Sequence, residues 1–193
     1  DSHAVTERYS AILQTAERLF GEKGYHGLSI DEIARESGVS KGLIFYHFTS
    51  KKALVERILE DALAELFIKW DAIAQNGESG QAKLRAAVAA CLDMARSRPY
   101  LMRIAFFGVN PEAEMKDIFI NLGEKLIPRV DALVSDGIAT GEFRTIDSRT
   151  AALLLLGMIA GPPLKGGLQP LALQSVDRIA DEIADIFCHG ICR

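Results

Sequence analysis

The sequence lacks an apolar run long enough to cross a membrane as a helix. Its most apolar stretch, Thr150 to Leu164, has 15 uncharged residues between Arg149 and Lys165. A helix that crosses a bilayer needs about 20. We therefore expect no membrane span and no membrane partner.

A net positive charge is also missing, and cysteines are few. The net charge of −4 excludes a protein that coats nucleic acid without sequence preference, because such proteins are basic throughout. The three cysteines, Cys91, Cys188 and Cys192, have no disulfide-framework spacing, which suits a reducing cytoplasm. With 49% apolar residues in 193, the chain can form a substantial core. We expect a globular, cytoplasmic protein.

Strand periodicity, internal repeats and catalytic motifs are missing. No useful length alternates with strand period, so we predict an all-α chain. There is no nucleotide-binding glycine loop, helical metal dyad or serine elbow, so we expect no enzyme, no catalytic residue and no cofactor. The segment from Cys188 to Cys192 offers three ligands where zinc needs four, and we expect no metal site.

What the sequence does contain is a pair of short helical patterns between Leu28 and Leu54, separated by the bend Gly38-Val39-Ser40. Ser29 and Glu32 form a capping box that begins the first helix. Gly38 can adopt the left-handed conformation that ends it, and Ser40 can cap the second helix. This pattern predicts a helix-turn-helix over about residues 29–48.

The second of these helices, Lys41 to Phe48, places Ile44 and Phe48 on one side and the other residues outward. No acidic residue occurs between Ser37 and Val55, whereas three lysines and a histidine do. This composition predicts a local field that favours phosphate. The alternative is that the aromatic residues are core and the lysines a solvated face. For His47, a partly buried ring without a base contact is also open.

The segment resembles the DNA-binding domain of the TetR family of bacterial transcriptional regulators. The family pattern G-V-S-x-G-x-[IL]-[FY]-Y-[HY]-F-x-[SN]-K is matched from Gly38 to Lys51, and an A-x-x-L-F-x-x-x-G-Y helix ending is matched from Ala16 to Tyr25. The resemblance implies that residues 40–47 enter a major groove and that Ser29, Tyr46 and Lys51 bind phosphates. The predicted DNA-binding residues are Ser29, Ser40, Lys41, Gly42, Leu43, Phe45, Tyr46, His47 and Lys51.

The remaining sequence predicts further helices, about nine in all. Their ranges are Thr6–Lys23 with Thr6 as cap, Ser50–Ala74, Gln81–Arg98, Tyr100–Phe107, Glu112–Ala139 kinked at Pro128, Arg149–Ala160 and Leu171–Cys188. We expect Gly161-Pro162-Pro163 to form a loop, because proline disrupts helices. The predicted domains are a three-helix DNA-binding domain, residues 4–52, and a helical ligand-binding and dimerisation domain, residues 53–193.

The last two helices are apolar on more faces than a single monomer contact uses. Two such helices from each of two subunits would form a four-helix bundle, the interface of a homodimer suited to a palindromic operator in double-stranded DNA. The alternative is that they form the monomer core. The predicted interface residues are Leu153, Leu156, Ile159, Val176, Ile179, Ala180, Ile183 and Phe187.

Large, adaptable side chains in the middle of the chain can line an apolar pocket, with Arg103 as an anchor for an anionic ligand. Core packing is the alternative. The predicted ligand-binding residues are Phe67, Trp70, Met94, Met102, Arg103, Phe106, Phe107 and Phe119. We interpret the chain as a transcriptional repressor that a small apolar or amphipathic effector releases from DNA. A helical enzyme or ligand carrier whose helix-turn-helix contacts another protein is the competing class.

Overall fold

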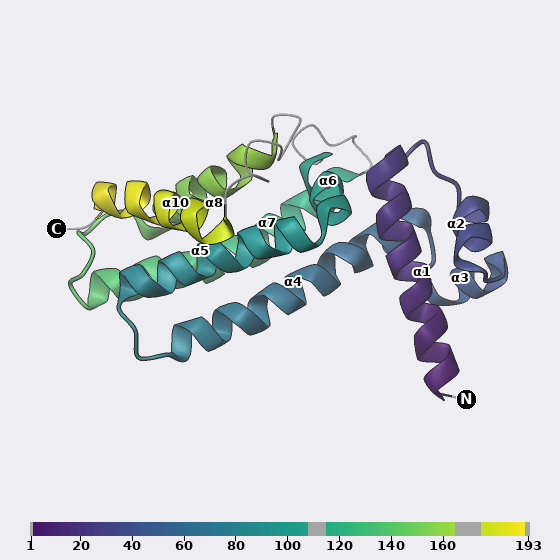
Figure 1. The fold of residues 1–193 in the computed structure, drawn as a ribbon, viewed down its shortest axis with the longest axis horizontal. Helices are drawn as coiled ribbons and strands as arrows, with labels where there is room; N and C mark the ends of the chain where they lie inside the picture. The colour runs from purple at the N-terminus through teal and green to yellow at the C-terminus, as the bar shows by residue number, and fades with distance from the viewer. Residues whose placement is uncertain (1, 108–114, 165–174, 192–193) are drawn as a thin grey trace. The chain divides into compact units, whose positions relative to one another are not determined.

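The computed structural model describes residues 2–107, 115–164 and 175–191 (Figure 1). Within these ranges the chain forms nine helices and no strand, which confirms the predicted all-α class. The helices are α1 (Ser2–Lys23), α2 (Ile30–Ser37), α3 (Lys41–His47), α4 (Lys51–Gln75), α5 (Gly80–Ser97), α6 (Pro99–Phe107), α7 (Lys116–Ala139), α8 (Ser148–Leu164) and α10 (Val176–Ile191). None of these helices has the length and apolar character needed to cross a bilayer.

The chain divides into two compact units. The first comprises residues 1–63 and 98–119, and the second comprises residues 64–97 and 120–193. This division differs from the predicted boundary after residue 52, because α6 packs against α1. The start of α4 and the start of α7 also belong to the first unit.

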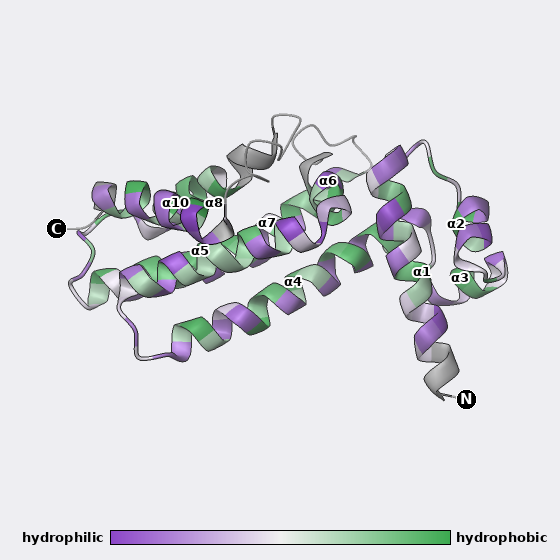
Figure 2. Cartoon of the chain, in the orientation of Figure 1, coloured by the Kyte–Doolittle hydropathy of each residue, from purple (hydrophilic) through white to green (hydrophobic). Residues whose placement is uncertain are grey.

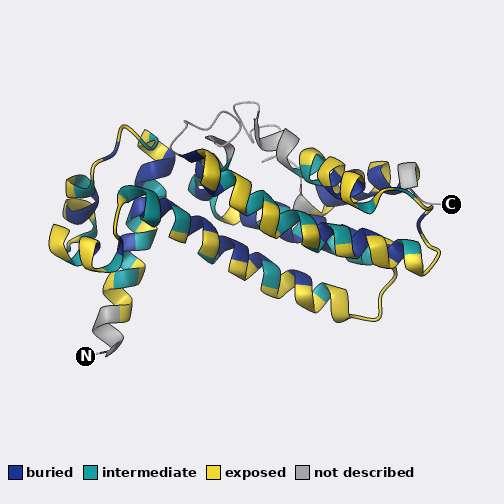
Figure 3. Ribbon diagram, turned by 180° about the vertical axis from the view of Figure 1, so that it is seen from behind, coloured by how far each residue is buried: buried dark blue, intermediate teal, exposed yellow. Residues whose placement is uncertain are grey.

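The first unit is built around α1. Ile12, Ala16, Leu19 and Phe20 are at most 2% exposed, and buried and exposed parts alternate along the N-terminal helix (Figure 3). This spacing is typical of a helix that buries one face. The predicted cap at Thr6 was wrong, because the helix already begins at Ser2.

The contact between α1 and α6 depends on Gly21. A Cβ at this position would lie 2.7 Å from Tyr100 Cβ and 2.8 Å from Tyr100 Cα, so only glycine permits this close approach. Arg98, directly before α6, forms an ion pair with Glu17 of α1. A close backbone contact and a charge pair therefore hold α6 on α1.

In the second unit, α5 packs against α10 and both contact α8. Hydropathy alternates along α5 and α10, with apolar and polar stripes on each ribbon (Figure 2). Phe143, 1% exposed, lies against Gly137, where a Cβ would come within 2.3 Å of its ring. The carboxylate of Glu142 accepts two bonds from the Gly80 N–H, at 2.9 and 3.0 Å. The turn after α7 is thereby joined to the start of α5.

The end of α8 differs from the prediction. The helix continues through Gly161, Pro162 and Pro163 to Leu164, so the predicted loop there was wrong. A proline loses only its own N–H bond and strains the preceding turn, and here the helix ends one residue after the pair. Pro128 lies inside α7 as expected. The predicted starts of the helices at Glu112 and Leu171 lie outside the described residues.

Candidate nucleic-acid interface

The helix-turn-helix has the predicted serine caps, whereas the Glu32 carboxylate, which was predicted to complete a capping box with Ser29, pairs with Lys23 and Arg35. Ser29 Oγ accepts a hydrogen bond from the Glu32 N–H at 3.2 Å, and Ser40 Oγ accepts one from the Leu43 N–H at 3.2 Å. Gly38, at φ 69°, ends α2, and its N–H donates to carbonyls of that helix. Both serine hydroxyls that were predicted to contact DNA thus also satisfy helix N-termini.

The outer side of α3 exposes a continuous set of residues. Lys41, Gly42, Phe45 and Tyr46 follow helical spacing and all are exposed. We call these four residues the recognition face. Phe45 is 46% exposed and Tyr46 is 81% exposed. Two large aromatic side chains in water on a short helix are typical of a surface that binds a partner.

The inner side of α3 is anchored to α1. Ile44 and Phe48 are at most 5% exposed, and the ring of Tyr9 stacks on Phe48 with centroids 5.4 Å apart. His47 contacts the rings of Tyr9 and Tyr46 edge-on, at 5.2 and 5.0 Å. These contacts hold the recognition face in a fixed orientation on the first unit.

His47 and Leu43 are only partly exposed. The Nε2 atom of His47 is buried and has no hydrogen-bond partner among the described residues. This placement corresponds to the alternative of a packed ring. A DNA contact by His47 or Leu43 stays a prediction.

The three lysines between Ser37 and Val55 all have partners within the protein. Lys41 Nζ lies 2.8 Å from Asp31 Oδ2. Lys51 Nζ donates to the carbonyls of Tyr25 and Leu28, at 2.6 and 3.0 Å, and lies over the Tyr25 ring. Lys52 pairs with Asp117, and its hydrogen bond to that carboxylate lowers the pKa of Asp117. The segment between Ser37 and Val55 contains no acidic residue, but acidic residues from other segments lie next to two of its lysines.

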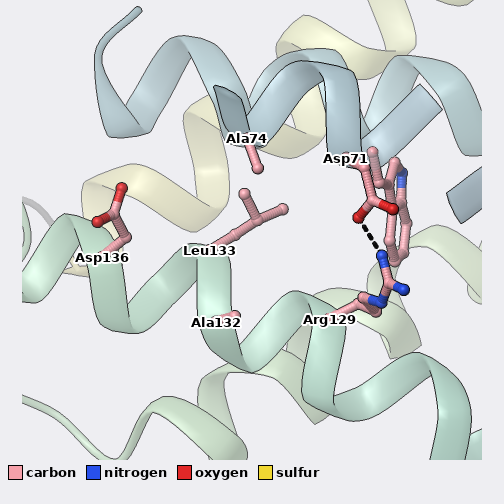
Figure 4. A pocket seen from close by; sticks show the side chains of 7 residues that line it. Asp71, Ala74, Arg129, Ala132, Leu133 and Asp136 are labelled. Carbon is pink, nitrogen blue, oxygen red and sulfur yellow. Dashed lines mark hydrogen bonds and ion pairs between the residues drawn. The ribbon is translucent and has the colours of Figure 1, made fainter. Parts of the chain in front are cut away.

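A separate cavity of about 310 Å³ lies in the second unit, between α4 and α7. Figure 4 shows Ala74 of α4 and Leu133 of α7 facing each other across it, with Arg129 directed at Asp71. The Arg129 guanidinium forms an ion pair with Asp71 and lies 4.5 Å from the centroid of the Phe67 ring. A smaller apolar cavity borders Trp70 and Ile159.

The predicted ligand-binding residues lie in different places. Trp70 is 3% exposed, lines both cavities and donates from Nε1 to the Ala87 carbonyl at 3.2 Å. Phe67 does not line the first cavity, but its ring contacts Arg129, which does. Met94 is 9% exposed in α5 and lines neither cavity. Arg103 is exposed and lines neither cavity.

Met102, Arg103 and Phe119 belong to the first unit, whereas the cavities are formed by the second. The side chains of Phe106 and Phe107 lie outside the description. The sequence reading missed Arg129, Asp71 and Asp136 as cavity residues. Their signal was weak, because each is a charged residue on an otherwise solvated helix face, and only the packing of α4 against α7 brings them together.

Four of the predicted dimer residues are buried by the chain itself. Ile179, Ala180, Ile183 and Phe187 are at most 7% exposed, which corresponds to the alternative of a monomer core. Leu156 and Ile159 are partly exposed, and the Val176 side chain lies outside the description. Among the described side chains of these two helices, the large apolar ones that are exposed are Leu153, which was predicted, and Leu154 and Ile186, which were not, at 50%, 62% and 65%.

The fold and this site define a helix-turn-helix DNA-binding protein. The family model described as "Bacterial regulatory proteins, tetR family" matches residues 12–58, and "Tetracyclin repressor-like, C-terminal domain" matches residues 77–164. The chain therefore belongs to the TetR family of bacterial DNA-binding transcriptional regulators.

Curated relatives are regulators too. The chain is 33% identical over 88 residues to the transcriptional repressor KstR2 of Rhodococcus jostii, a match that covers 46% of this chain and 43% of KstR2. It is 25% identical over 154 residues to the transcriptional regulator EthR of Mycolicibacterium smegmatis, covering 77% of this chain and 71% of EthR. The chain thus spans less than half of KstR2.

Solved structures share the fold. FadR from Bacillus subtilis in complex with stearoyl-CoA has a TM-score of 0.84 at 18% identity, covering 95% of this chain and 99% of that one. AibR in complex with isovaleryl coenzyme A and operator DNA has a TM-score of 0.74 at 22% identity, covering 93% and 97%. At these identities the likeness establishes the arrangement of helices.

Proposed function

We propose that this protein is a repressor that binds a palindromic operator as a homodimer and is released by a small amphipathic molecule. The observation that carries the DNA-binding role is the recognition face, with Phe45 and Tyr46 exposed on a helix that buried contacts hold in place. In a helix-turn-helix protein the second helix enters the major groove. Base edges would be read from this face, and the Tyr46 hydroxyl would donate to a phosphate.

The dimer would form through the exposed apolar side of α8 and α10. On α8, Leu153, Leu154 and Gly157 follow helical spacing and are exposed, and a Cβ at Gly157 would meet no atom within 4 Å. A glycine beside two exposed leucines lets a second helix approach closely. Ile186 adds an exposed apolar group on α10. A two-fold dimer presents two recognition faces to two half-sites.

The cavity between α4 and α7 would hold the effector. Its walls combine the apolar side chains of Trp70, Ala74 and Leu133 with the charged groups Arg129 and Asp71. An anionic or zwitterionic head group would compete with Asp71 for the guanidinium, while an apolar portion contacts the walls. The effector class is therefore an amphipathic small molecule with a negatively charged group.

Release requires that the effector bind one conformation better than the other. Helix α4 contributes Lys51 to the first unit and Trp70, Asp71 and Ala74 to the cavity. An effector that shifts α4 in each subunit would change the spacing of the two recognition faces. DNA binding and effector binding are then reciprocally coupled.

Fluorescence anisotropy with duplexes selected from a random library tests the DNA-binding role, with a scrambled duplex as control. Binding that is no tighter than to the scrambled duplex refutes it.

Light scattering tests the dimer. Leu153→Glu combined with Ile186→Glu should give monomers, whereas Ile68→Glu, at a comparably exposed isoleucine of α4, should not. A monomeric wild type at micromolar concentration contradicts the dimer.

To test the effector class, we would titrate the protein–DNA complex with three probes. Fatty acyl-CoA thioesters and free fatty acids are anionic and amphipathic, and choline is cationic. We expect release by the anionic amphipathic probes and not by choline. Arg129→Gln should weaken that response, while Arg103→Gln, at an exposed arginine outside the cavity, should leave it unchanged. Equal responses of the two variants would contradict the assigned cavity.

A further inference from the structure

One ion pair joins the two helices of the helix-turn-helix near their N-terminal ends. Lys41 Nζ donates to Asp31 Oδ2 at 2.8 Å, and the two side chains are 51% and 70% exposed. Lys41 is the first residue of α3 and Asp31 is the second residue of α2. The Asp31 carboxylate therefore lies beside the recognition face, on the surface that the proposed function brings to DNA.

The charges of the motif make this pair distinctive. Residues 29–48 contain three acidic residues, Asp31, Glu32 and Glu36, and two basic ones, Arg35 and Lys41, which gives a net charge of −1 with histidine neutral. Glu32 and Glu36 pair with cations of α1 and α2, including Arg35. Lys41 is the only Lys, Arg, Asp or Glu in α3, and Asp31 compensates its charge.

We propose that Asp31 is a specificity-determining residue of the DNA-binding surface. It holds the Lys41 ammonium and thereby lowers affinity for arbitrary duplexes more than for the operator. This inference rests on the proposed DNA-binding function.

The physical reason lies in the difference between the two kinds of binding. Binding to arbitrary sequence comes almost entirely from cations that neutralise phosphates, so a free Lys41 would add one such contact in every register. Binding to an operator also uses base edges, and lysine pairs with the O6 and N7 atoms of guanine. A Lys41 held toward α2 is less available to phosphates, whereas a base contact in the correct register can replace Asp31.

Asp31→Asn is a clean test because an exposed ion pair contributes little to folding. We would measure anisotropy with a random-sequence duplex and with the tightest duplex selected from a library, between about 50 and 200 mM salt. For the random duplex, Asp31→Asn should raise affinity and steepen the plot of log K against log salt by about 0.9 per bound subunit. Affinity for the selected duplex should rise less, so the ratio of the two affinities falls.

Matched controls isolate the pair. Glu36→Gln removes the same charge from the same helix, at a carboxylate that pairs with Arg18 and Arg35 rather than with Lys41, and should leave the salt slope unchanged. In a Lys41→Met background, Asp31→Asn should no longer steepen the slope. If Asp31→Asn lowers the melting temperature, Asp31→Ala replaces it, because alanine has the highest helix propensity.

An unchanged slope in Asp31→Asn, or an equal change in Glu36→Gln, would overturn the role of the pair. Steepening that persists without Lys41 would also overturn it. A wild-type protein that binds no duplex would instead refute the proposed DNA-binding function, so the two failures are distinguishable.

Discussion

At the scale of single residues, Lys51 illustrates how a side chain can have two roles. The resemblance to the family implies a phosphate contact, and Lys51→Ala is then expected to weaken binding about equally on all sequences. In the structure the ammonium bonds two backbone carbonyls of the segment between α1 and α2. Lys51 therefore joins the start of α4 to the loop that leads into the helix-turn-helix.

We expect Lys51→Met to lower the free energy of unfolding by about 1–2 kcal/mol, because two charge-assisted hydrogen bonds are lost while the apolar stem is kept. Lys52→Met, which removes an exposed ion pair with Asp117, should cost less than about 1 kcal/mol. Urea denaturation measures both. If Lys51→Met is as stable as wild type yet loses DNA affinity, the lysine acts on phosphate alone.

Tyr46 is the second residue-scale prediction. Because its side chain is 81% exposed, Tyr46→Phe should change stability by less than about 0.5 kcal/mol. Loss of one hydrogen bond to phosphate should weaken duplex binding by about 1 kcal/mol. Tyr100→Phe, the same chemical change on α6, should leave binding unchanged. Anisotropy and thermal melts decide the question, and equal binding by wild type and Tyr46→Phe would remove the phosphate role.

At the scale of elements, Gly21 controls how closely α6 approaches α1. A Cβ there would meet the Tyr100 backbone at 2.8 Å, so the two helices would have to separate. We expect Gly21→Ala to destabilise the protein by about 1–3 kcal/mol. Gly123→Ala in α7, where a Cβ would meet only Ile127 at 3.9 Å, should stabilise by up to about 1 kcal/mol, because alanine favours helix.

Differential scanning calorimetry of these two alanine variants gives the comparison. Opposite shifts of the melting temperature are the expected result. Similar shifts would mean that helix propensity, rather than the contact between α1 and α6, determines the effect of a methyl group at Gly21.

At the scale of the whole molecule, stability should depend on acid. Hydrogen bonds from Lys23, Lys52, Thr150 and Arg85 lower the pKa of Glu32, Asp117, Asp147 and Asp181, respectively. A carboxyl whose pKa is lower in the folded state contributes stability above its unfolded pKa and loses that contribution as the pH falls through the folded pKa. We therefore expect the melting temperature to decrease when the pH is lowered below about 4.

Melts at a series of pH values, in low and high salt, test this expectation. Three of the four partners are cations, so added salt should reduce the dependence on pH. Asp181→Asn should reduce it too, whereas Asp131→Asn, at a carboxylate for which no ion pair is found among the described residues, serves as the control. A melting temperature that is flat between neutral and acidic pH would contradict the linkage.

The sequence alone determined the helix-turn-helix and which side of its second helix faces outward. Caps at Ser29, Gly38 and Ser40, and buried positions at Ile44 and Phe48, are local signals that depend on backbone hydrogen bonding and helical period. They predicted the helix-turn-helix and the exposed aromatic residues of α3 correctly. The family resemblance, confirmed by the matching family models, rests on these same residues.

Tertiary structure alone decided which groups from distant segments meet. Nothing in the local pattern indicates that Asp31 neutralises Lys41, that Asp71 and Arg129 share a cavity, or that α10 buries Ile183 against its own chain. Charge pairing and burial depend on distances between helices, and those distances follow from packing contacts such as the one at Gly21. Local propensity specifies a helix, but only its neighbours specify which face of that helix remains in water.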